Sequence, residues 1–427
     1  MAVSREKTIS SALSPNTEQD DLELIKQLIW HPRKIKLGAS VNLLEETFSD
    51  FIKQDYCFAF NGGRTAFLAI LQALGIKEGE EVLVQGLTCA VLVAPILHLK
   101  AKPVFVDIDE TLNIDPIDLK DKITKKAKVI VVQHTFGWPG KIAEIKAIAK
   151  EHNLFLVEDC AHSLGSKYQG NYCGTFGDAS FFSFGRDKVI SSVFGGLAST
   201  NNASIALGIK KFQQKIKYPS FWWTFKQLLN PILTNNFILP FYSFHSLGKL
   251  ALIFLQKTSI LPRSVSEKEK QGKMPKQFIK KMPDKLAVLA KYQLAKLEKF
   301  NEHRKSIADF YIQALKGSNF ILPFNRPLGE DSPNFMKFPI LTSTNPKIIL
   351  AKAQKANILL GDGWRETPVV PFDTNIEKMG YQWGSCPKAE KIAACLVNLP
   401  THINISHEGA QKIVNFLKSS NGNSGNN

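Results

Sequence analysis

The chain has 427 residues, of which 44% are hydrophobic and 22% charged, and its formal net charge is +16. This composition is typical of a folded globular protein and excludes a wholly disordered chain, while the length predicts two domains. The positive charge could serve a nucleic acid, an anionic membrane or an anionic substrate, but no zinc-finger spacing or RNP motif accompanies it, so we expect no nucleic-acid partner.

Both ends of the chain are predicted to be flexible, at residues 1–20 and 419–427, where the tail reads SSNGNSGNN. The six cysteines form no CxxC pair, and the N-terminus MAVSREKTISS lacks the apolar stretch of a signal peptide. We therefore expect reduced thiols in a cytoplasmic protein, which could also sit peripherally at the inner face of the membrane.

Short apolar segments alternate with helical segments from Phe51 to Thr200. Strands alternating with helices predict an α/β domain with a mostly parallel, doubly wound sheet, here over residues 21–280. Such a sheet binds ligands beyond the carboxyl ends of its strands. The four clearest predicted strands and the helix between the last two are Glu81–Gln85, Lys102–Val106, Val129–Gln133, Phe155–Glu158 and Ile142–His152.

An aromatic and basic segment, residues 203–266, interrupts this pattern. No Asp or Glu lies between Lys188 and Ser266, whereas nine Lys or Arg residues do, counting Lys188 itself. The segments FWWTFKQLL and LGKLALIFL mix bulky apolar residues with lysine, as helices at an anionic membrane surface do. The alternatives are a helical subdomain packed on a dimer partner or over the active site, and a lid over a large or lipid-linked substrate.

The C-terminal part of the chain predicts a smaller α+β domain over residues 281–418. It begins with one long helical stretch, Lys285–Leu315. A strand and two helices follow, at Phe335–Thr342, Lys347–Ala356 and Gly409–Leu417.

Two charged residues stand at positions where an apolar strand ends. Asp159 follows the strand FLVE, and a carboxylate there could keep the pyridine nitrogen of pyridoxal 5′-phosphate (PLP) protonated, although an N-cap is the simpler role for an isolated Asp. Lys188 ends the segment ASFFSFGRDK, where burying an amine is costly unless a site uses it. It could hold PLP as a Schiff base; by itself it would be one of many surface lysines.

An anion site is predicted beside these residues. Asn61–Thr65 reads NGGRT and opens a helix over Ala66–Leu74, and glycines at a helix N-terminus leave backbone N–H groups free for a phosphate. Ser183 lies five residues before Lys188 and could add a hydroxyl. A glycine-rich turn without a ligand is the alternative.

Taken together, these motifs resemble those of the PLP-dependent sugar aminotransferases of the DegT/DnrJ/StrS type, which have the fold type I architecture. That architecture has a large domain with a mostly parallel seven-stranded sheet and a smaller C-terminal α+β domain. The segments that carry the resemblance are NGGRTAFLAILQALGIKEGEEVLV, AKPVFVDIDETLNIDP, HTFGWPGKIAEIKAIAKEHNL, VEDCAHSLGSKYQG, GTFGDASFFSFGRDK, GGLAST and CPKAEKIAACLVNLPTH.

The resemblance implies a role for each residue of the motifs around Lys188. Lys188 would bond to the cofactor and shuttle the proton, Asp159 would hold the pyridinium, and His162 would contact the ring hydroxyl. Cys89 occupies the position where the family usually has an aromatic residue over the cofactor ring, so stacking must come from a smaller group or from elsewhere.

The same resemblance places the cofactor's phosphate on Ser183 and on the turn that contains Gly63, Arg64 and Thr65. The Asn that a partner subunit usually contributes has no clear counterpart here. Arg365, in GDGWRETP, could hold a phosphate or carboxylate of the substrate, or be a surface arginine.

The implied activity is transfer of an amino group, with glutamate as the expected donor, to a keto sugar linked to a nucleotide, for polysaccharide or glycolipid synthesis. The implied assembly is a homodimer, and no metal is expected. Some relatives replace the lysine by His and become dehydratases, and Lys188 therefore favours transamination. A PLP-dependent dehydratase or lyase, and a non-catalytic membrane-associated regulator on the same fold, are the alternatives.

Overall fold

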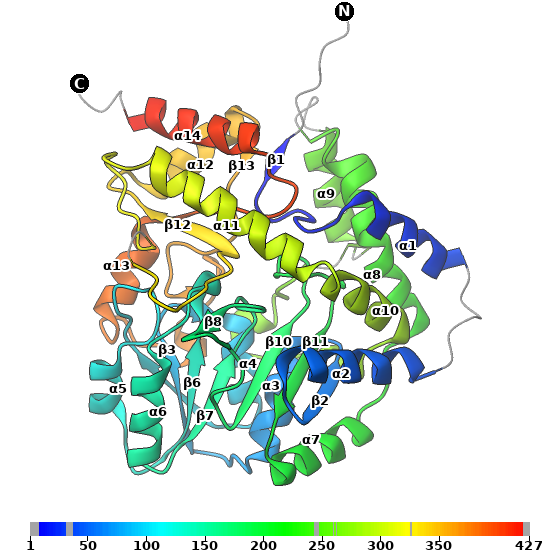
Figure 1. Ribbon diagram of the computed structural model, residues 1–427, viewed down its shortest axis with the longest axis vertical. Coiled ribbons are helices and arrows are strands. Elements are labelled where there is room, and N and C mark those ends of the chain that lie inside the picture. The colour runs from blue at the N-terminus through cyan, green and yellow to red at the C-terminus, as the bar shows by residue number, and fades with distance from the viewer. Residues whose placement is uncertain are drawn as a thin grey trace, which may run out of the picture.

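The computed structural model describes residues 8–30, 37–242, 247–258, 260–261, 263–324 and 327–421. A twisted sheet with helices on both faces makes up the lower part of the molecule in Figure 1, and a smaller part with α11, α12 and α14 lies above it. The strand ends that carry the predicted site residues point toward the boundary between the two parts.

The central sheet has seven strands in the order β2-β11-β10-β7-β6-β3-β5. Strand β11 runs antiparallel to β2 and β10, and the remaining neighbours are parallel, which confirms the predicted mostly parallel seven-stranded sheet. The strands are Tyr56–Phe60 (β2), Gly196–Thr200 (β11), Ala179–Ser183 (β10), Phe155–Asp159 (β7), Ala127–Gln133 (β6), Glu81–Gln85 (β3) and Lys102–Val106 (β5).

Helices cover both faces of this sheet because its central strands are apolar on both sides and need a cover on each. On one face α3 packs against α7 and α4, and on the other α5 packs against α6. The helices of the large domain are Ala39–Ile52 (α2), Gly63–Ala73 (α3), Ala90–His98 (α4), Pro116–Lys122 (α5), Ile142–Glu151 (α6) and Ala203–Lys215 (α7).

The smaller part is built on an antiparallel pair of strands, β12 and β15, with helices packed around it. Its elements are Leu297–Ala314 (α11), Lys337–Leu341 (β12), Pro346–Lys355 (α12), Ile358–Leu359 (β13), Val369–Val370 (β14), Pro387–Cys395 (α13), Leu396–Pro400 (β15) and His407–Asn421 (α14). The last helix extends into the predicted flexible tail, of which residues 422–427 lie outside the described residues.

The N-terminal segment also belongs to the fold, where the sequence predicts flexibility. Strand β1 (Ile9–Ser10) pairs in parallel with β13, and Asn16 is buried before helix α1 (Gln19–Trp30). These contacts hold because the segment covers apolar surface of the smaller part. Residues 1–7 lie outside the described residues.

The single helical stretch predicted for Lys285–Leu315 is two helices. Helix α10 (Asp284–Leu294) packs on α2 and α1, whereas α11 starts at Leu297 and packs on α14. The chain bends between them because each helix buries its apolar face against a different partner. Helix α10 therefore joins the large domain, although residue 281 is the predicted start of the small one.

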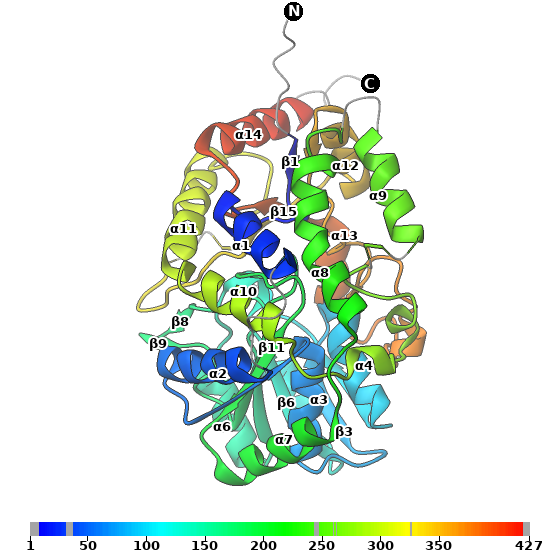
Figure 2. The same ribbon diagram turned by 90° about the vertical axis from the view of Figure 1, so that its right-hand side faces the viewer.

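The aromatic segment 203–266 divides into two parts. Helix α7 is part of the large domain, because it packs on α3. The rest forms α8 (Phe221–Leu233), a π-helical turn (η3, Thr234–Ile238) and α9 (Leu247–Lys257). In Figure 2 α8 and α9 lie on the side of the molecule that faces the viewer.

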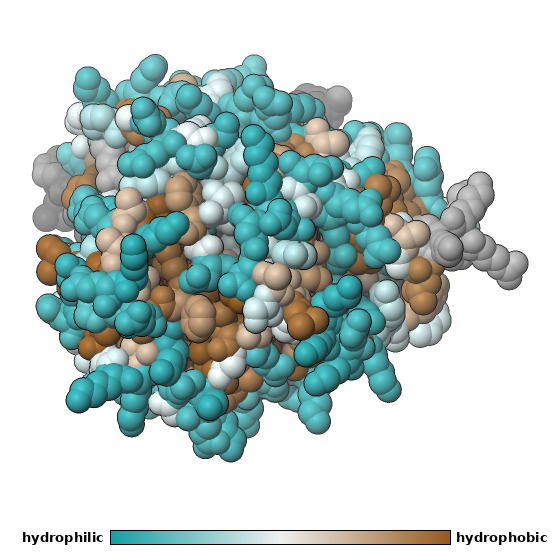
Figure 3. All heavy atoms as spheres, turned by 60° about the horizontal axis from the view of Figure 1, so that its bottom comes forward, coloured by the Kyte–Doolittle hydropathy of each residue, from teal (hydrophilic) through white to brown (hydrophobic). Residues whose placement is uncertain are grey.

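Figure 3 shows the face at the bottom of Figure 1, where apolar side chains gather between hydrophilic ones. Among the described residues, none of the helices has the length and apolar character needed to cross a bilayer.

One close approach inside the sheet yields a prediction about stability. A Cβ at Gly196, in β11, would overlap the backbone of Gly62 and Gly63, which start helix α3. Gly196→Ala should therefore destabilise the protein by about 1–3 kcal/mol, since neither backbone segment can move freely. Urea unfolding checks this, with Gly62→Ala as the matched control, because a Cβ at Gly62 meets nothing within 4 Å. Equal stabilities of the two variants would contradict the packing argument.

Candidate active site

A single pocket gathers most of the residues predicted from the sequence. It lies beyond the carboxyl ends of β6, β7 and β10, and the residues 362–364 and 370–371 of the smaller part close it. Seven of the nine predicted residues line it: Gly63, Arg64, Cys89, Asp159, His162, Ser183 and Lys188. Thr65 and Arg365 do not. This is the ligand position expected for a doubly wound sheet.

Asp159 ends strand β7 and is buried. Its Oδ1 accepts a hydrogen bond from the backbone N–H of Ala161 at 2.9 Å. Burial raises the pKa of Asp159 to about 6, while the Ala161 N–H and the nearby charges of Lys188 and His134 limit the rise. A positive group of a ligand placed against this carboxylate would favour its charged form.

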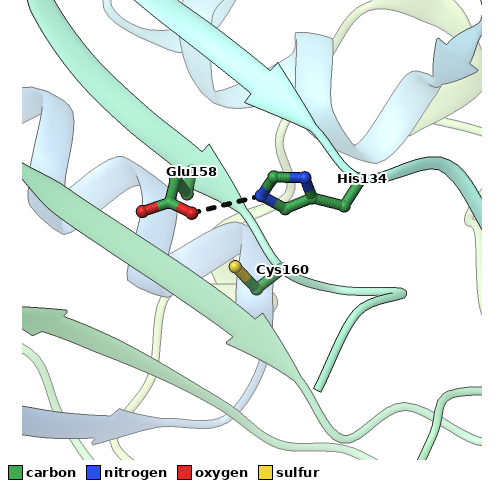
Figure 4. Close-up of side chains that lie close together, drawn as sticks. All are labelled: His134, Glu158 and Cys160. Carbon is green, nitrogen blue, oxygen red and sulfur yellow. Dashed lines mark hydrogen bonds and ion pairs between the residues drawn. The ribbon is translucent and has the colours of Figure 1, made fainter. Parts of the chain in front are cut away.

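A buried pair next to Asp159 holds the ends of β6 and β7 together. Figure 4 shows Glu158 facing His134 with Cys160 beside them, and His134 Nε2 lies 3.1 Å from Glu158 Oε2. The Glu158 oxygens also accept three backbone N–H groups, those of Gly174, Phe176 and Gly177. His134 Nδ1 accepts the N–H of Gly140, so Nε2 carries the proton that Glu158 accepts. The carboxylate and both imidazole nitrogens are therefore engaged within the protein, and the cluster is structural.

His162 lines the pocket as a neutral ring. Burial, with the charges of Lys188 and Lys337, holds the pKa of His162 well below its ordinary value. Its Nδ1 accepts the backbone N–H of Phe136 at 3.3 Å, so the proton is on Nε2. The ring of Phe136 stacks on it with centroids 5.8 Å apart, which fixes its plane. Nε2 is a fixed hydrogen-bond donor.

Lys188 sits in a turn that the N-terminal segment and α11 hold from behind. Asn16 Nδ2 donates to the carbonyl of Lys188, and buried Arg304 donates to Asn16 Oδ1 at 2.7 Å and to the carbonyl of Val189. Both supports come from far along the chain. They fix the backbone of the turn and leave the lysine side chain directed to the pocket, of which it is a lining residue.

The N-terminus of α3 and Ser183 line the pocket together, at the place where the sequence predicts an anion cradle. A Cβ at Gly63 would come within 3.1 Å of the Phe182 carbonyl oxygen and of Ser183 Cβ, so only glycine leaves this space open. Thr65 is not part of the cradle. Its N–H bonds to the Gly62 carbonyl at 3.0 Å, and its hydroxyl bonds to Asn61 and to the Phe278 carbonyl.

Cys89 lines the pocket at the position where the family usually has an aromatic residue. An aromatic residue from the smaller part, Trp364, also lines the pocket. Cys89 pairs with Val370 where β4 (Thr88–Cys89) meets β14. Trp364 lines the pocket and lies edge-on to His162, with ring centroids 5.2 Å apart. Arg365, the next residue, turns away: its Nε lies 2.8 Å from Glu366, and its guanidinium covers Phe372.

A buried ion cluster, which the sequence argument missed, links the two domains beside Lys188. Lys337, on β12, lies 2.9 Å from Asp362 and 3.7 Å from Asp187. Burial acts to lower the pKa of Lys337, but the two carboxylates hold it above its ordinary value. Asp187 and Asp362 line the pocket. The one signal in the sequence is a lysine at the start of the apolar strand KFPIL.

Comparisons with known proteins agree with this geometry. The sequence model of the DegT/DnrJ/EryC1/StrS aminotransferase family matches residues 15–222 and 257–418. The chain is 41% identical over 169 residues to GDP-perosamine synthase of Escherichia coli O157:H7, a match that covers 39% of this chain and 46% of that protein. The chain thus spans less than half of that relative's length.

A second relative matches over most of its length, and a solved structure shares the fold. The spore coat polysaccharide biosynthesis protein SpsC of Bacillus subtilis (strain 168) is 26% identical over 388 residues, 89% of each chain. The structure of Helicobacter pylori PseC, an aminotransferase involved in the biosynthesis of pseudoaminic acid, superposes with a TM-score of 0.75 at 20% identity, covering 97% of this chain and 99% of that one.

The raised pKa of Asp159 yields a prediction for the ligand-free protein. A carboxyl with a pKa of about 6 in the folded state and 3.8 ordinarily binds more protons folded than unfolded, so its contribution to stability falls as pH rises between these values. Asp159→Asn removes this contribution. The free energy of unfolding of the variant minus that of the wild type should therefore be larger at pH 7 than at pH 4, by up to about 3 kcal/mol. Urea unfolding at the two pH values measures it. A constant difference between the proteins would contradict the raised pKa.

Proposed function

We propose, from the premise that this chain belongs to the DegT/DnrJ/EryC1/StrS aminotransferase family, that it is a PLP-dependent aminotransferase acting on a keto sugar. The observation that carries the proposal is the meeting of Lys188, Asp159 and the Gly63 cradle in one pocket. The three come from different strands and loops, and each supplies a group that this cofactor needs.

The pocket fits PLP at both of its ends. The α3 N-terminus and the Ser183 hydroxyl suit a phosphate, and the space there exists because residue 63 has no Cβ. The buried Asp159 carboxylate, which lines the same pocket, suits a protonated pyridine nitrogen. When bound, PLP supplies an electron sink that stabilises negative charge at the reacting carbon.

Each residue around the pocket then has its own proposed role. Asp159 would hold the pyridine nitrogen in its protonated form. The Nε2–H of His162, held by the Phe136 contacts, would be the donor to the ring hydroxyl. The Lys188 amine would hold the cofactor in the resting protein and, when free, would be the group that accepts and returns a proton. The Asn16 and Arg304 contacts keep its backbone in place during both tasks.

The proposed substrates are a nucleotide-linked keto sugar and an amino donor, glutamate. The similarity to GDP-perosamine synthase and to a spore coat polysaccharide biosynthesis protein supports this class. The product would be an amino sugar for polysaccharide or glycolipid synthesis. A homodimer is proposed from the same family membership, and analytical ultracentrifugation of the holoprotein tests it.

The role of Lys188 gives the central prediction. Wild-type protein with PLP should show a visible absorbance band that borohydride fixes to the chain, and Lys188→Ala should lose the fixation and at least about 10²–10⁴-fold of the transamination rate. Lys150→Ala, at an exposed position on α6, is the matched control and should behave as wild type. A reducible covalent adduct in Lys188→Ala would contradict the assignment of Lys188 as the residue that holds PLP. Failure of glutamate to convert the bound cofactor to its amine form would exclude glutamate as the donor.

We further propose that α9 rests on an anionic membrane surface. Leu247, Leu250 and Phe254 recur at helical spacing and are 50%, 58% and 63% exposed, so α9 presents an apolar stripe outward. Lys249 and Lys257 belong to the same helix, within the acid-free stretch of the chain. Anionic lipid complements this charge, at roughly 1 kcal/mol for each basic residue near the surface, whereas a second copy of the same basic surface would repel it.

Liposome flotation checks the membrane proposal. The protein should float with phosphatidylglycerol vesicles at low salt and less at high salt, and Leu250→Glu with Phe254→Glu should abolish flotation by removing the apolar stripe. Leu207→Glu, at an exposed leucine of α7, is the matched control. Absence of wild-type flotation at low salt would remove the proposal, as would equal flotation of the α9 variant.

A further inference from the structure

The inner side of α8 packs behind two residues that line the active-site pocket, Arg186 and Phe194. Residues 223–256 lie outside the part of the chain that the family's sequence model matches, and α8 falls almost entirely within them. Gln227, fully buried on α8, accepts a hydrogen bond from Arg186 Nη2 at 3.2 Å. Trp223, one turn earlier, packs edge-on against Phe194, with ring centroids 5.4 Å apart. A segment that the family's sequence model does not match, residues 223–256 (the added segment), thus supports two residues that line the pocket.

Arg186 stands two residues before Lys188 and lines the same pocket. Its guanidinium carbon lies 5.3 Å from the centre of the Phe194 ring, so the ring supports one side of the group while Gln227 holds an Nη. Gln227 is itself fixed, because its Nε2 donates to the carbonyl of Trp223. The partner that α8 supplies is a neutral amide, which orients the guanidinium without cancelling its charge.

The neighbouring arginine is arranged differently. Arg64 forms an ion pair with the buried carboxylate of Glu269 and donates to the Ser264 carbonyl at 2.8 Å. Its charge is therefore balanced within the chain, and it serves to hold the segment around Ser264 over the pocket. Burial lowers the pKa of Arg186 to about 10, which still leaves it charged at neutral pH. The charge of the adjacent Asp187 also favours the charged form of Arg186, and both arginines are held in place at the wall of the pocket.

Both proposed substrates bring an anionic group to this pocket. The amino donor has carboxylates, and a nucleotide-linked sugar has a diphosphate. A guanidinium presents a planar set of donors that matches either group with paired hydrogen bonds.

Resting on the proposed function, we propose that Arg186 is a specificity-determining residue that binds an anionic group of the substrate, and that Gln227 and Trp223 of the added segment position it. The carboxylate of the donor and the diphosphate of the sugar nucleotide share the required chemistry. The added segment therefore supports the substrate site from behind as well as forming a surface element.

Binding of two unreactive probes to the PLP-loaded protein tests this. Glutarate has the two carboxylates of glutamate without the amine, and GDP or UDP has the diphosphate without the sugar. Calorimetry should show that Arg186→Gln weakens binding of at least one probe by roughly 30-fold or more, while the cofactor's absorbance band is unchanged. Loss for glutarate alone assigns the donor carboxylate, and loss for the nucleotides alone assigns the diphosphate. Arg263→Gln, at an exposed arginine of the acid-free stretch, is the matched control.

Variants of Gln227 separate positioning from simple packing. Gln227→Leu should weaken binding of the same probe by a smaller factor. Gln227→Glu keeps an acceptor for Arg186 but adds a carboxylate that competes with the ligand, so it should weaken binding more than Gln227→Leu does. Wild-type binding in Gln227→Leu would show that Gln227 serves packing alone and would overturn its positioning role.

The outcomes that contradict this proposal differ from those that contradict the proposed function. Wild-type affinities for both probes in Arg186→Gln and in Arg186→Lys, with an intact band, would overturn the role of Arg186 and leave transamination standing. Wild-type protein with no reducible band and no conversion by an amino donor would overturn the proposed function itself.

Discussion

The geometry of the site depends on a carboxylate that does not line the pocket. Glu158, one residue before Asp159, accepts hydrogen bonds from His134 and from three backbone N–H groups with none of its side chain exposed. A buried charge is tolerated only with such complete pairing. The network locks the end of β7 to the end of β6 and to the loop before β10. The direction of the Asp159 side chain, and with it the geometry of the pocket, follows from that lock.

The second constraint is that Lys188 lies in a turn rather than in a strand, and a turn needs support from outside. Asn16 and Arg304 supply it from the N-terminal segment and from α11, while Lys337 ties Asp187, the neighbour of Lys188, to the smaller domain. Asn16, Arg304 and Lys337 are buried. The two domains are thus joined at the residue next to Lys188, so a shift of the smaller domain would move the turn that carries Lys188.

The added segment has two faces with different chemistry. Its inner face places Gln227 and Trp223 behind the pocket residues Arg186 and Phe194, and its outer face carries the apolar stripe of α9 with lysines on the same helix. One insertion therefore connects the surface of the molecule to the substrate site. An enzyme whose substrates or products leave along a membrane would gain from such a connection.

The sequence by itself determined the sheet, since its strands are apolar on both faces, and the motif residues Asp159, His162, Ser183 and Lys188, since each stands at a strand end or in a turn beside it. Only the tertiary structure decided which distant groups hold them: Asn16 meets Lys188 across 172 positions, and Gln227 meets Arg186 across 41. The break between α10 and α11, the pairing of β1 with β13 and the placing of Arg365 outside the pocket were also invisible in the sequence. The physical reason is that local periodicity and strand-end position act within a few residues, whereas buried polar pairs and helix bends are set by surfaces that meet only when the chain has folded.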